Sequence, residues 1–319
     1  MVNTLYLAKR IVVAVISVLI VISVVFGMTE ALPGSAADIA LGTAQTEESV
    51  QQFKQQMGLD RPLYVRYVEF IVSTITFNFG DSFLSGEPVM KVLAPAVQKT
   101  LELAIVATLL SIVTAIPLGV LTAAKRRSIF DNLTLNTSYI LVSVPSFVSA
   151  TLLLLVFTSP PLNFFPSGGY EPISKGMFTW LHHLILPAIS LNVVIFAYVL
   201  RQTRSSMIET LESDYIRTAR LKGVGEAKVL MRHALRNGLL PTVTVVAINF
   251  GWMMGAVVIV EEIFSYPGVG QLIVRAISSR DLPVLQAAIL IPTIAFISAN
   301  LLADILYTIM DPRIGLGEK

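Results

Sequence analysis

Six apolar runs, each long enough to cross a lipid bilayer as a helix, most constrain what this chain can fold into. They cover residues 11–28, 101–124, 133–158, 184–200, 239–260 and 284–310. A helix rises about 1.5 Å per residue, so about twenty apolar residues cross the hydrocarbon core. The composition agrees, with 54% hydrophobic and 14% charged residues. We predict an all-α membrane protein with six transmembrane helices, the third of which contains Pro145.

The first run has a second interpretation as a cleaved secretory signal. Lys9 and Arg10 precede it, and small residues follow at 35–37. The run is longer than an ordinary signal core, so we expect a retained helix within residues 1–30.

Basic residues predict the orientation. Lys125, Arg126 and Arg127, the charged stretch 201–236 and both chain ends fall on one side, which the positive-inside rule makes cytoplasmic. Both termini are then cytoplasmic. The net charge of +2 gives no reason to expect nucleic acid as a partner, and the absence of cysteine excludes a disulfide scaffold.

Residues 31–98 are predicted to form a small extracytoplasmic domain, with an ordinary long loop as the alternative. Thr46, followed by two acidic residues, predicts the start of a helix, and Gly58 predicts its end. The apolar residues between them are Val50, Phe53 and Met57. A second amphipathic piece opens at Arg61-Pro62 and continues through Tyr64, Tyr67, Val68 and Ile71.

The stretch 201–238 is the longest charge-dense segment between two apolar runs. Ile208, Leu211, Tyr215 and Ala219 predict one face of a helix over 207–222, and Gly223-Val224-Gly225 ends it. A second short helix is expected over 226–236, with Leu230 and Ala234 on one face. Two helices joined by a glycine turn form a compact knob that can dock in a groove of a partner. The alternative is a solvated basic loop that only sets topology.

Within this stretch the sequence resembles the cytoplasmic Glu-Ala-Ala loop of ATP-binding-cassette importer permeases. Arg217, Thr218 and Ala219 stand at the Glu-Ala-Ala positions and Gly223 at the glycine, while His233, Leu235 and Arg236 stand at the later Ile, Leu and Pro positions. Ala219, Gly223 and Leu235 fit the general motif. The departures are those of the dipeptide/oligopeptide branch, where Arg-Thr-Ala and His-Ala-Leu are usual.

Further motifs resemble the same branch over nearly the whole chain. They are residues 32–35, 79–82, 204–207, 262–264, 267–270 and 311–313. The resemblance implies a type I importer permease fold divided into an N-terminal segment and first helix (1–30), an extracytoplasmic domain (31–98), a five-helix core (99–310) and a cytoplasmic tail (311–319). It implies four kinds of partner: a second permease subunit in a heterodimer, two cytoplasmic ATPase subunits, an external substrate-binding protein and the lipid bilayer. The bilayer is expected to be the plasma membrane of a bacterium or archaeon. The residues it marks for coupling to the ATPase are Asp214, Tyr215, Arg217, Thr218, Ala219, Gly223, His233 and Leu235.

No catalytic or metal-binding residue is predicted. Residues 223–228 contain two glycines and a lysine, but at the wrong spacing for a P-loop, so ATP and Mg would be held by partner subunits and this chain needs no cofactor. His182 and His183 could form a metal pair, but neighbours on a helix point in different directions, so a place at the membrane interface is preferred.

Polar residues inside apolar runs are candidates for the translocation path. They are Glu102, Asn249, Glu261, Glu262, Asn300 and Asp304. Capping a helix, pairing across a dimer or bonding between helices are their alternatives. Residues 267–274 are expected to form either a short helix that braces the outer gate or a simple turn.

The predicted function is the permease subunit of an importer, with di- or oligopeptides as the leading substrates. Nickel chelates, glutathione and oligosaccharides remain alternatives. A secondary transporter would show an internal repeat, which the sequence lacks. An intramembrane enzyme would place a nucleophile and a base inside the runs, whereas the three histidines lie near or outside their boundaries.

Overall fold

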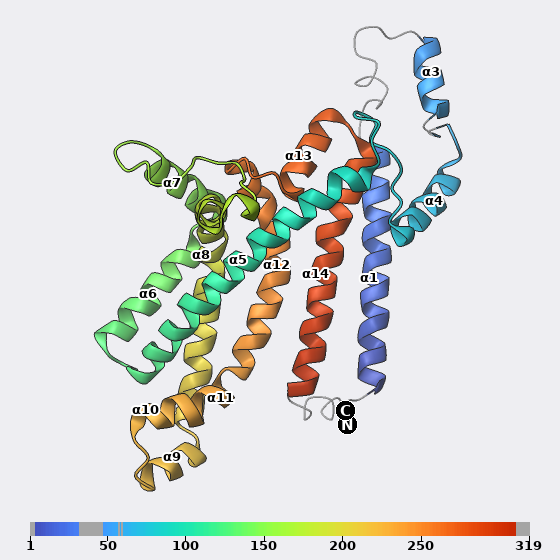
Figure 1. Ribbon diagram of the computed structural model, residues 1–319. Coiled ribbons are helices and arrows are strands. Elements are labelled where there is room, and N and C mark those ends of the chain that lie inside the picture. The colour runs from blue at the N-terminus through green and yellow to red at the C-terminus, as the bar shows by residue number, and fades with distance from the viewer. Residues whose placement is uncertain (1–3, 32–46, 57, 59, 311–319) are drawn as a thin grey trace.

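The computed structural model describes residues 4–31, 47–56, 58 and 60–310, and it is built from helices (Figure 1). Within this described part the sole β pairing is an isolated bridge between Asp81 and Pro88. The predicted all-α class is therefore confirmed. Side chains of residues 302–310 are outside the described set.

Five helices are long and apolar enough to cross a membrane, and a bent pair makes a sixth crossing if it is counted as one. The five are α1 (Thr4–Ala31), α5 (Val89–Ala124), α8 (Met177–Leu211), α12 (Leu240–Ile263) and α14 (Leu282–Met310). The bent pair is α6 (Ile129–Ser143) and α7 (Ser146–Thr158). Each predicted apolar run thus lies on one of these helices or on the pair.

The third run is not the continuous helix that the sequence predicted. Its two halves meet at an angle of 102°. Val144 is extended, with φ −87° and ψ 121°, which is the conformation that a following proline favours. Pro145 then starts α7, and its carbonyl oxygen accepts from the backbone N–H of Val148 at 3.0 Å. Proline therefore breaks this span instead of bending it.

The second and fourth spans are longer than predicted. The helix expected from residue 101 begins at Val89, and the helix expected over 184–200 runs from Met177 to Leu211. The predicted second span began just after Lys99 and the fourth ended just before Arg201, but the end of a membrane helix can carry charged residues where it leaves the bilayer. Both helices therefore extend beyond the apolar run into the segments that flank it.

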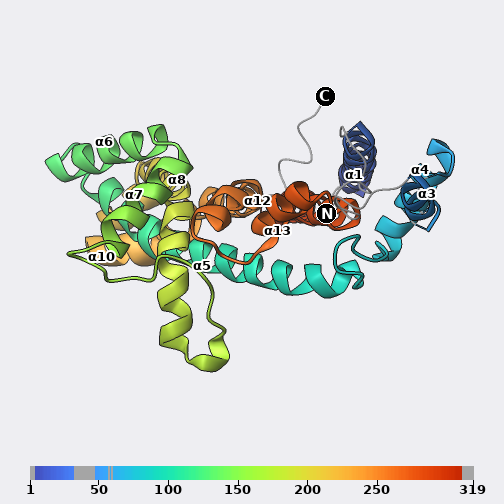
Figure 2. The same ribbon diagram turned by 90° about the horizontal axis from the view of Figure 1, so that it is seen from above.

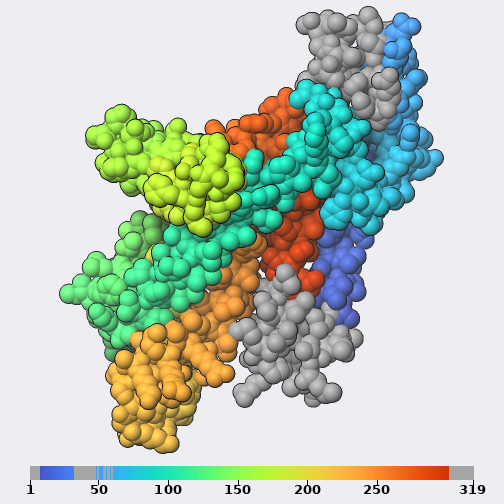
Figure 3. Space-filling view, viewed as in Figure 1, coloured from blue at the N-terminus to red at the C-terminus, as the bar shows by residue number. Residues whose placement is uncertain are grey.

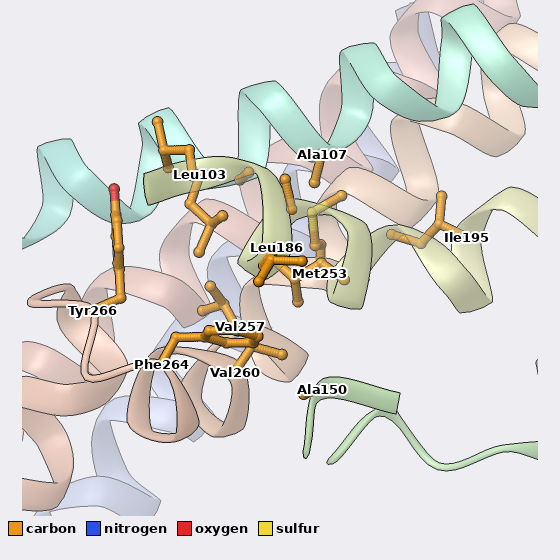
Figure 4. Close-up of a cluster of buried hydrophobic side chains, with 14 of the residues drawn as sticks. Leu103, Ala107, Ala150, Leu186, Ile195, Met253, Val257, Val260, Phe264 and Tyr266 are labelled. Carbon is orange, nitrogen blue, oxygen red and sulfur yellow. The ribbon is translucent and has the colours of Figure 1, made fainter. Parts of the chain in front are cut away.

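The main core lies between α5, α8 and α12, and Figure 4 shows part of it. Leu103, Leu186 and Val257 are fully or almost fully buried there. Gly119 of α5 lets α8 approach closely, because a Cβ at this position would lie 2.7 Å from Cβ of Thr203. Small residues at such crossings are typical of helix packing in membranes.

A second core joins α1, the start of α5, α13 (Val269–Ser279) and α14. Seen from above, α12 and α13 lie between α6, α7 and α8 on one side and α1 and α4 on the other (Figure 2). Of the two alternatives for residues 267–274, the structure contains the helix, as α13.

The predicted extracytoplasmic segment contains α3 (Glu47–Gln56) and α4 (Leu63–Thr76). Both correspond to helices expected from the sequence. Thr46 and Met57, at the two ends of the first of these helices, lie outside the described residues. In Figure 1, α3 and α13 lie at the end of the molecule opposite the knob, while α1 begins and α14 ends on the knob's side.

Candidate coupling site and supporting clusters

The knob consists of α9 (Asp214–Leu221), α10 (Glu226–Lys228), a π-helical segment (Val229–Ala234) and α11 (Leu235–Gly238). It follows α8 and projects from one end of the molecule (Figure 3). The compact knob predicted from the sequence is present, with one difference in its first helix.

The predicted helix over 207–222 is broken after Leu211. Ser213 is extended, with φ −71° and ψ 152°, and its hydroxyl donates to the carbonyl oxygen of Thr210 at 2.6 Å. Serine competes in this way with helical backbone bonds. The break turns α9 relative to α8, so that Ile216 is fully buried while Tyr215, predicted on the apolar face, is 44% exposed.

A small apolar cluster fixes the knob to the membrane helices. Ile216, Val229 and Ala234 pack with Met207 of α8 and Val120 of α5. Asn237 donates to the hydroxyl oxygen of Tyr215 at 3.0 Å, which ties the second arm of the knob to the first. The knob and the ends of α5 and α8 therefore share one cluster of packed side chains.

Gly223 closes α9 with a Schellman turn. Its N–H donates to the carbonyl oxygen of Arg220 at 2.9 Å, and the N–H of Val224 donates to that of Ala219 at 3.2 Å. The φ of Gly223 is +78°, a conformation that side-chain-bearing residues adopt at a cost. Arg220 also pairs with Glu226 at 2.7 Å across the turn, and this hydrogen bond lowers the pKa of Glu226.

The predicted coupling residues divide into a surface set and a supporting set. Asp214, Tyr215, Arg217, Thr218 and Gly223 are exposed, whereas Ala219, His233 and Leu235 are half-buried. Two large apolar side chains that the motif does not include are also exposed, Leu221 at 81% and Met231 at 63%. The knob thus presents apolar and basic groups together on a folded support, which is suited to a protein groove.

Asp131 and Arg204 form a junction near the base of the knob that the sequence did not reveal. Arg204 of α8 donates to both carboxylate oxygens of Asp131, at 2.6 and 2.8 Å. The N–H of Arg127 donates to the same carboxylate at 2.9 Å. Asp131 is 1% exposed and the Arg204 side chain 20% exposed, so a largely buried bidentate pair joins α6 to α8.

Asp131→Ala is expected to lower stability by about 3–5 kcal/mol, because it leaves the Arg204 guanidinium without its partner. The measurement is the thermal unfolding midpoint of the purified protein. The control is Arg61→Ala, which removes an ion pair to Glu69 whose side chains are more than half exposed and should cost less than about 1 kcal/mol. Equal midpoints for the two variants would show that the buried pair is not a structural junction.

Glu102, a predicted path residue, is held by hydrogen bonds at the other end of the molecule. Its carboxylate accepts from the hydroxyl of Tyr170 and the indole N–H of Trp180, both at 2.9 Å, and from the amide of Gln98 at 2.9 Å. Burial, followed by this hydrogen bond, raises the pKa of Tyr170 to about 12, so the phenol remains a donor. Here Glu102 clamps the loop between α7 and α8 to α5.

Glu261, near the end of α12, is fully buried, and its carboxylate faces the start of α13. Its carboxylate accepts from the hydroxyl of Thr100 and from the N–H of Gly270, both at 2.6 Å. Thr100 in turn accepts from the N–H of Val269 at 2.8 Å. This arrangement is the helix-capping alternative left open by the sequence, and it explains why residues 267–270 are rich in glycine.

The remaining path candidates are dispersed. Asn249 donates to the carbonyl oxygen of Val245 in its own helix at 2.8 Å, and Glu262 is exposed. Asn300 lines a groove of about 360 Å³ between α1 and α14. The side chain of Asp304 lies outside the described residues. The structure does not gather the five candidates whose side chains it describes into one site, and the path role of all six stays a prediction.

The two histidines bond to backbone carbonyls. A ring N–H of His182 donates to the oxygen of Phe164 at 2.8 Å, and one of His183 donates to that of Thr179 at 3.0 Å. Their ring planes are nearly perpendicular, at 87°. Each therefore has a local structural partner at the start of α8.

A helical chain with five or six membrane crossings and a folded projection beyond one end is a multi-pass membrane protein. Comparison with known families identifies the class more closely. Residues 115–316 match the family of binding-protein-dependent transport system inner membrane components, and residues 3–104 match the corresponding N-terminal family. The chain belongs to this family.

Full-length relatives agree with the family match. A Brucella abortus protein named for a peptide transport system is 40% identical over 98% of this chain and 99% of its own length. The oligopeptide transport system permease protein AppB of Bacillus subtilis is 36% identical over 97% and 98%. The glutathione transport system permease protein GsiC of Salmonella paratyphi A is 34% identical over 97% and 98%.

These matches confirm the resemblance inferred from the sequence. The chain is a permease subunit of an ATP-binding-cassette importer, which implies ATPase and substrate-binding partners and a membrane setting. The all-α type I permease fold is confirmed with it.

Proposed function

We propose that the chain forms one half of a peptide translocation path and transmits ATPase motion to it through the knob. The observation that carries this proposal is the knob's construction: an exposed apolar and basic surface stands on a core shared with α5 and α8. Closure of the ATPases pushes the knob, and the buried Asp131–Arg204 pair passes the displacement to α6. Several relatives named for peptide systems support the substrate class.

The finer assignments belong to the same proposal. The chain is non-catalytic, pairs with a second and different permease subunit, and holds both termini and the knob in the cytoplasm. Residues 31–98 face the binding protein, residues 99–310 form the core with the coupling loop at 201–238, and residues 311–319 are a cytoplasmic tail. The basic residues of the knob and of the loop between α5 and α6 support this orientation.

Uptake by the reconstituted importer tests the proposal. Proteoliposomes that contain this chain, its partner permease, both ATPases and the binding protein should accumulate labelled di- or oligopeptides only when ATP and binding protein are present. Glutathione, itself a peptide, is the second candidate because of its named relative, and labelled glutathione and a nickel chelate should be compared in parallel. Accumulation by the chain alone under an ion gradient would contradict the proposal.

A further inference from the structure

Helix α4 carries an apolar stripe that no part of the described structure covers. Tyr64 is 72% exposed, Val68 56%, Val72 53% and Ile75 68%. Their spacings of four, four and three residues place them on one face of the helix. An isolated exposed apolar residue is ordinary, but four large ones in a row on one face indicate a contact surface.

A second face of α4 fixes its position relative to the membrane. The hydroxyls of Tyr67 and Ser23 are hydrogen-bonded at 2.6 Å, and the ring of Phe26 lies 5.4 Å from that of Tyr67 and 5.7 Å from that of Phe70. Ser23 and Phe26 belong to the apolar span Ala8–Ala31 of α1. Figure 1 shows α4 beside the end part of α1 that is nearer to α13.

These contacts indicate how deep α4 lies in the lipid bilayer. Phe26 and Ser23 lie roughly one and a half to two helical turns before the end of the span, which corresponds to about 8–12 Å along α1. A span of this length exceeds the hydrocarbon core by only a few Å at each end. The middle of α4 therefore lies at the level of the outer acyl chains, just below the lipid headgroups.

The neighbouring span α1 also carries exposed apolar side chains. On α1, Ile20, Val24 and Met28 are 57%, 51% and 67% exposed. The third face of α4 is polar. Arg66 pairs there with Glu30 at the end of α1, and both side chains are about one-fifth exposed. One face of α4 thus contacts α1, one is polar, and one is apolar and open.

We propose that α4 is an interfacial helix whose Tyr64, Val68, Val72 and Ile75 side chains are inserted among the acyl chains of the outer leaflet. The occupant of the stripe is lipid, because a water-soluble partner would have to reach below the headgroup level to cover Val72 and Ile75. The amphipathic pattern and the polar third face are those of helices that lie in the membrane interface.

Insertion of α4 has a consequence for the outer end of the permease. The loop after α4 is tied to the start of α14, since Asp281 accepts from the hydroxyl of Ser82 at 2.5 Å and from the N–H of Phe83 at 3.1 Å. Insertion in the bilayer thus fixes the position of α4, and α4 fixes the loop of Ser82 and Phe83 that is hydrogen-bonded to Asp281 before α14. The inference rests on membership of the membrane family, not on the peptide substrate.

Spin labelling of the assembled importer in lipid vesicles tests the proposal. The chain contains no cysteine, so a single introduced cysteine is unique within it, and the partner subunits are prepared without reactive cysteines. Labels are placed by Val72→Cys and Ile75→Cys. Glu69→Cys, on the wet side of the same helix, is the aqueous control, and Val24→Cys in α1 is the lipid control.

At each position, the frequency of collisions between the spin label and oxygen, which concentrates in lipid, is compared with that between the label and a water-soluble chromium complex. Collisions with oxygen should be the more frequent at positions 72, 75 and 24, and collisions with the chromium complex at position 69. Dominance of the chromium complex at 72 and 75 would place the stripe in water. Low accessibility to both reagents would show that the binding protein or another protein surface covers it. Either result overturns the proposal.

Discussion

Gly223→Val is expected to reduce ATP-driven uptake by roughly tenfold or more while the membrane helices still assemble. A valine at φ +78° costs about 1–3 kcal/mol of backbone strain, and 1.4 kcal/mol corresponds to a tenfold change in an equilibrium. The strain is relieved by unwinding the Schellman turn, which separates the exposed face of α9 from the second arm of the knob. Uptake and ATPase stimulation by loaded binding protein are measured on the same proteoliposomes.

Two control variants separate the effect of backbone strain at position 223 from the effect of the size of the added side chain. Gly223→Asn should retain most of the activity, because asparagine tolerates the left-handed region. Gly225→Val places the same side chain two residues away, where φ is −62° and no atom lies within 4 Å of a Cβ, and should have a much smaller effect. Normal uptake and normal ATPase stimulation by Gly223→Val would show that the turn has no part in coupling.

Gly268→Ala is expected to destabilise the protein by about 3–5 kcal/mol. The φ and ψ of Gly268, −98° and −167°, suit any residue, but a Cβ there would lie 2.0 Å from Oε1 of Glu261. The carboxylate must then leave its pocket and lose its bonds to Thr100 and to the start of α13, which adds to the cost of overpacking. The measurement is the thermal unfolding midpoint of the purified complex in detergent.

The matched control for this variant is Gly255→Ala in α12. No atom lies within 4 Å of a Cβ at position 255, and alanine in a helix is favoured over glycine by about 0.5–1 kcal/mol. A double variant supplies the second check. Gly268→Ala combined with Glu261→Ala should be no less stable than Glu261→Ala alone, because the clash has been removed. Additive losses in the double variant would disprove the proposed clash.

The fold was predictable where one physical signal dominated. Runs of about twenty apolar residues have few alternatives to a membrane helix, and all of the predicted runs lie on long helices or on the bent pair. The 102° break at Pro145 was not predictable, because proline in a membrane helix is compatible with a kink as well as with a break.

The sequence predicted the knob correctly in outline, but the prediction of its first helix was wrong. Gly223 gave a correct helix end, since the turn requires a positive φ. Periodicity placed Tyr215 inward, but the break at Ser213 makes Ile216 the buried residue. A serine just before Asp214, a residue type that is common at helix starts, was the available signal for a new helix, although its side chain makes no capping bond here.

The buried polar partners were beyond prediction from one sequence. Thr100 and Glu261 are 161 positions apart, and Ser82 and Asp281 are 199 apart. No pattern of neighbouring residues in the sequence predicts that two residues so far apart will be in contact. An acidic residue near the end of a span is equally compatible with a path, a cap or an ion pair, and packing shows Glu261 as a cap.

Site-specific photo-crosslinking tests the coupling role of the knob most directly. A photoreactive amino acid replaces Leu221, which is 81% exposed on the knob, and in a matched variant it replaces Ile173, which is 53% exposed in the loop between α7 and α8. In the assembled importer, illumination should join position 221 to an ATPase subunit, with a yield that changes when ATP is bound, and position 173 should give no such product. Absence of an ATPase adduct at position 221, with crosslinking intact elsewhere in the complex, would contradict the account.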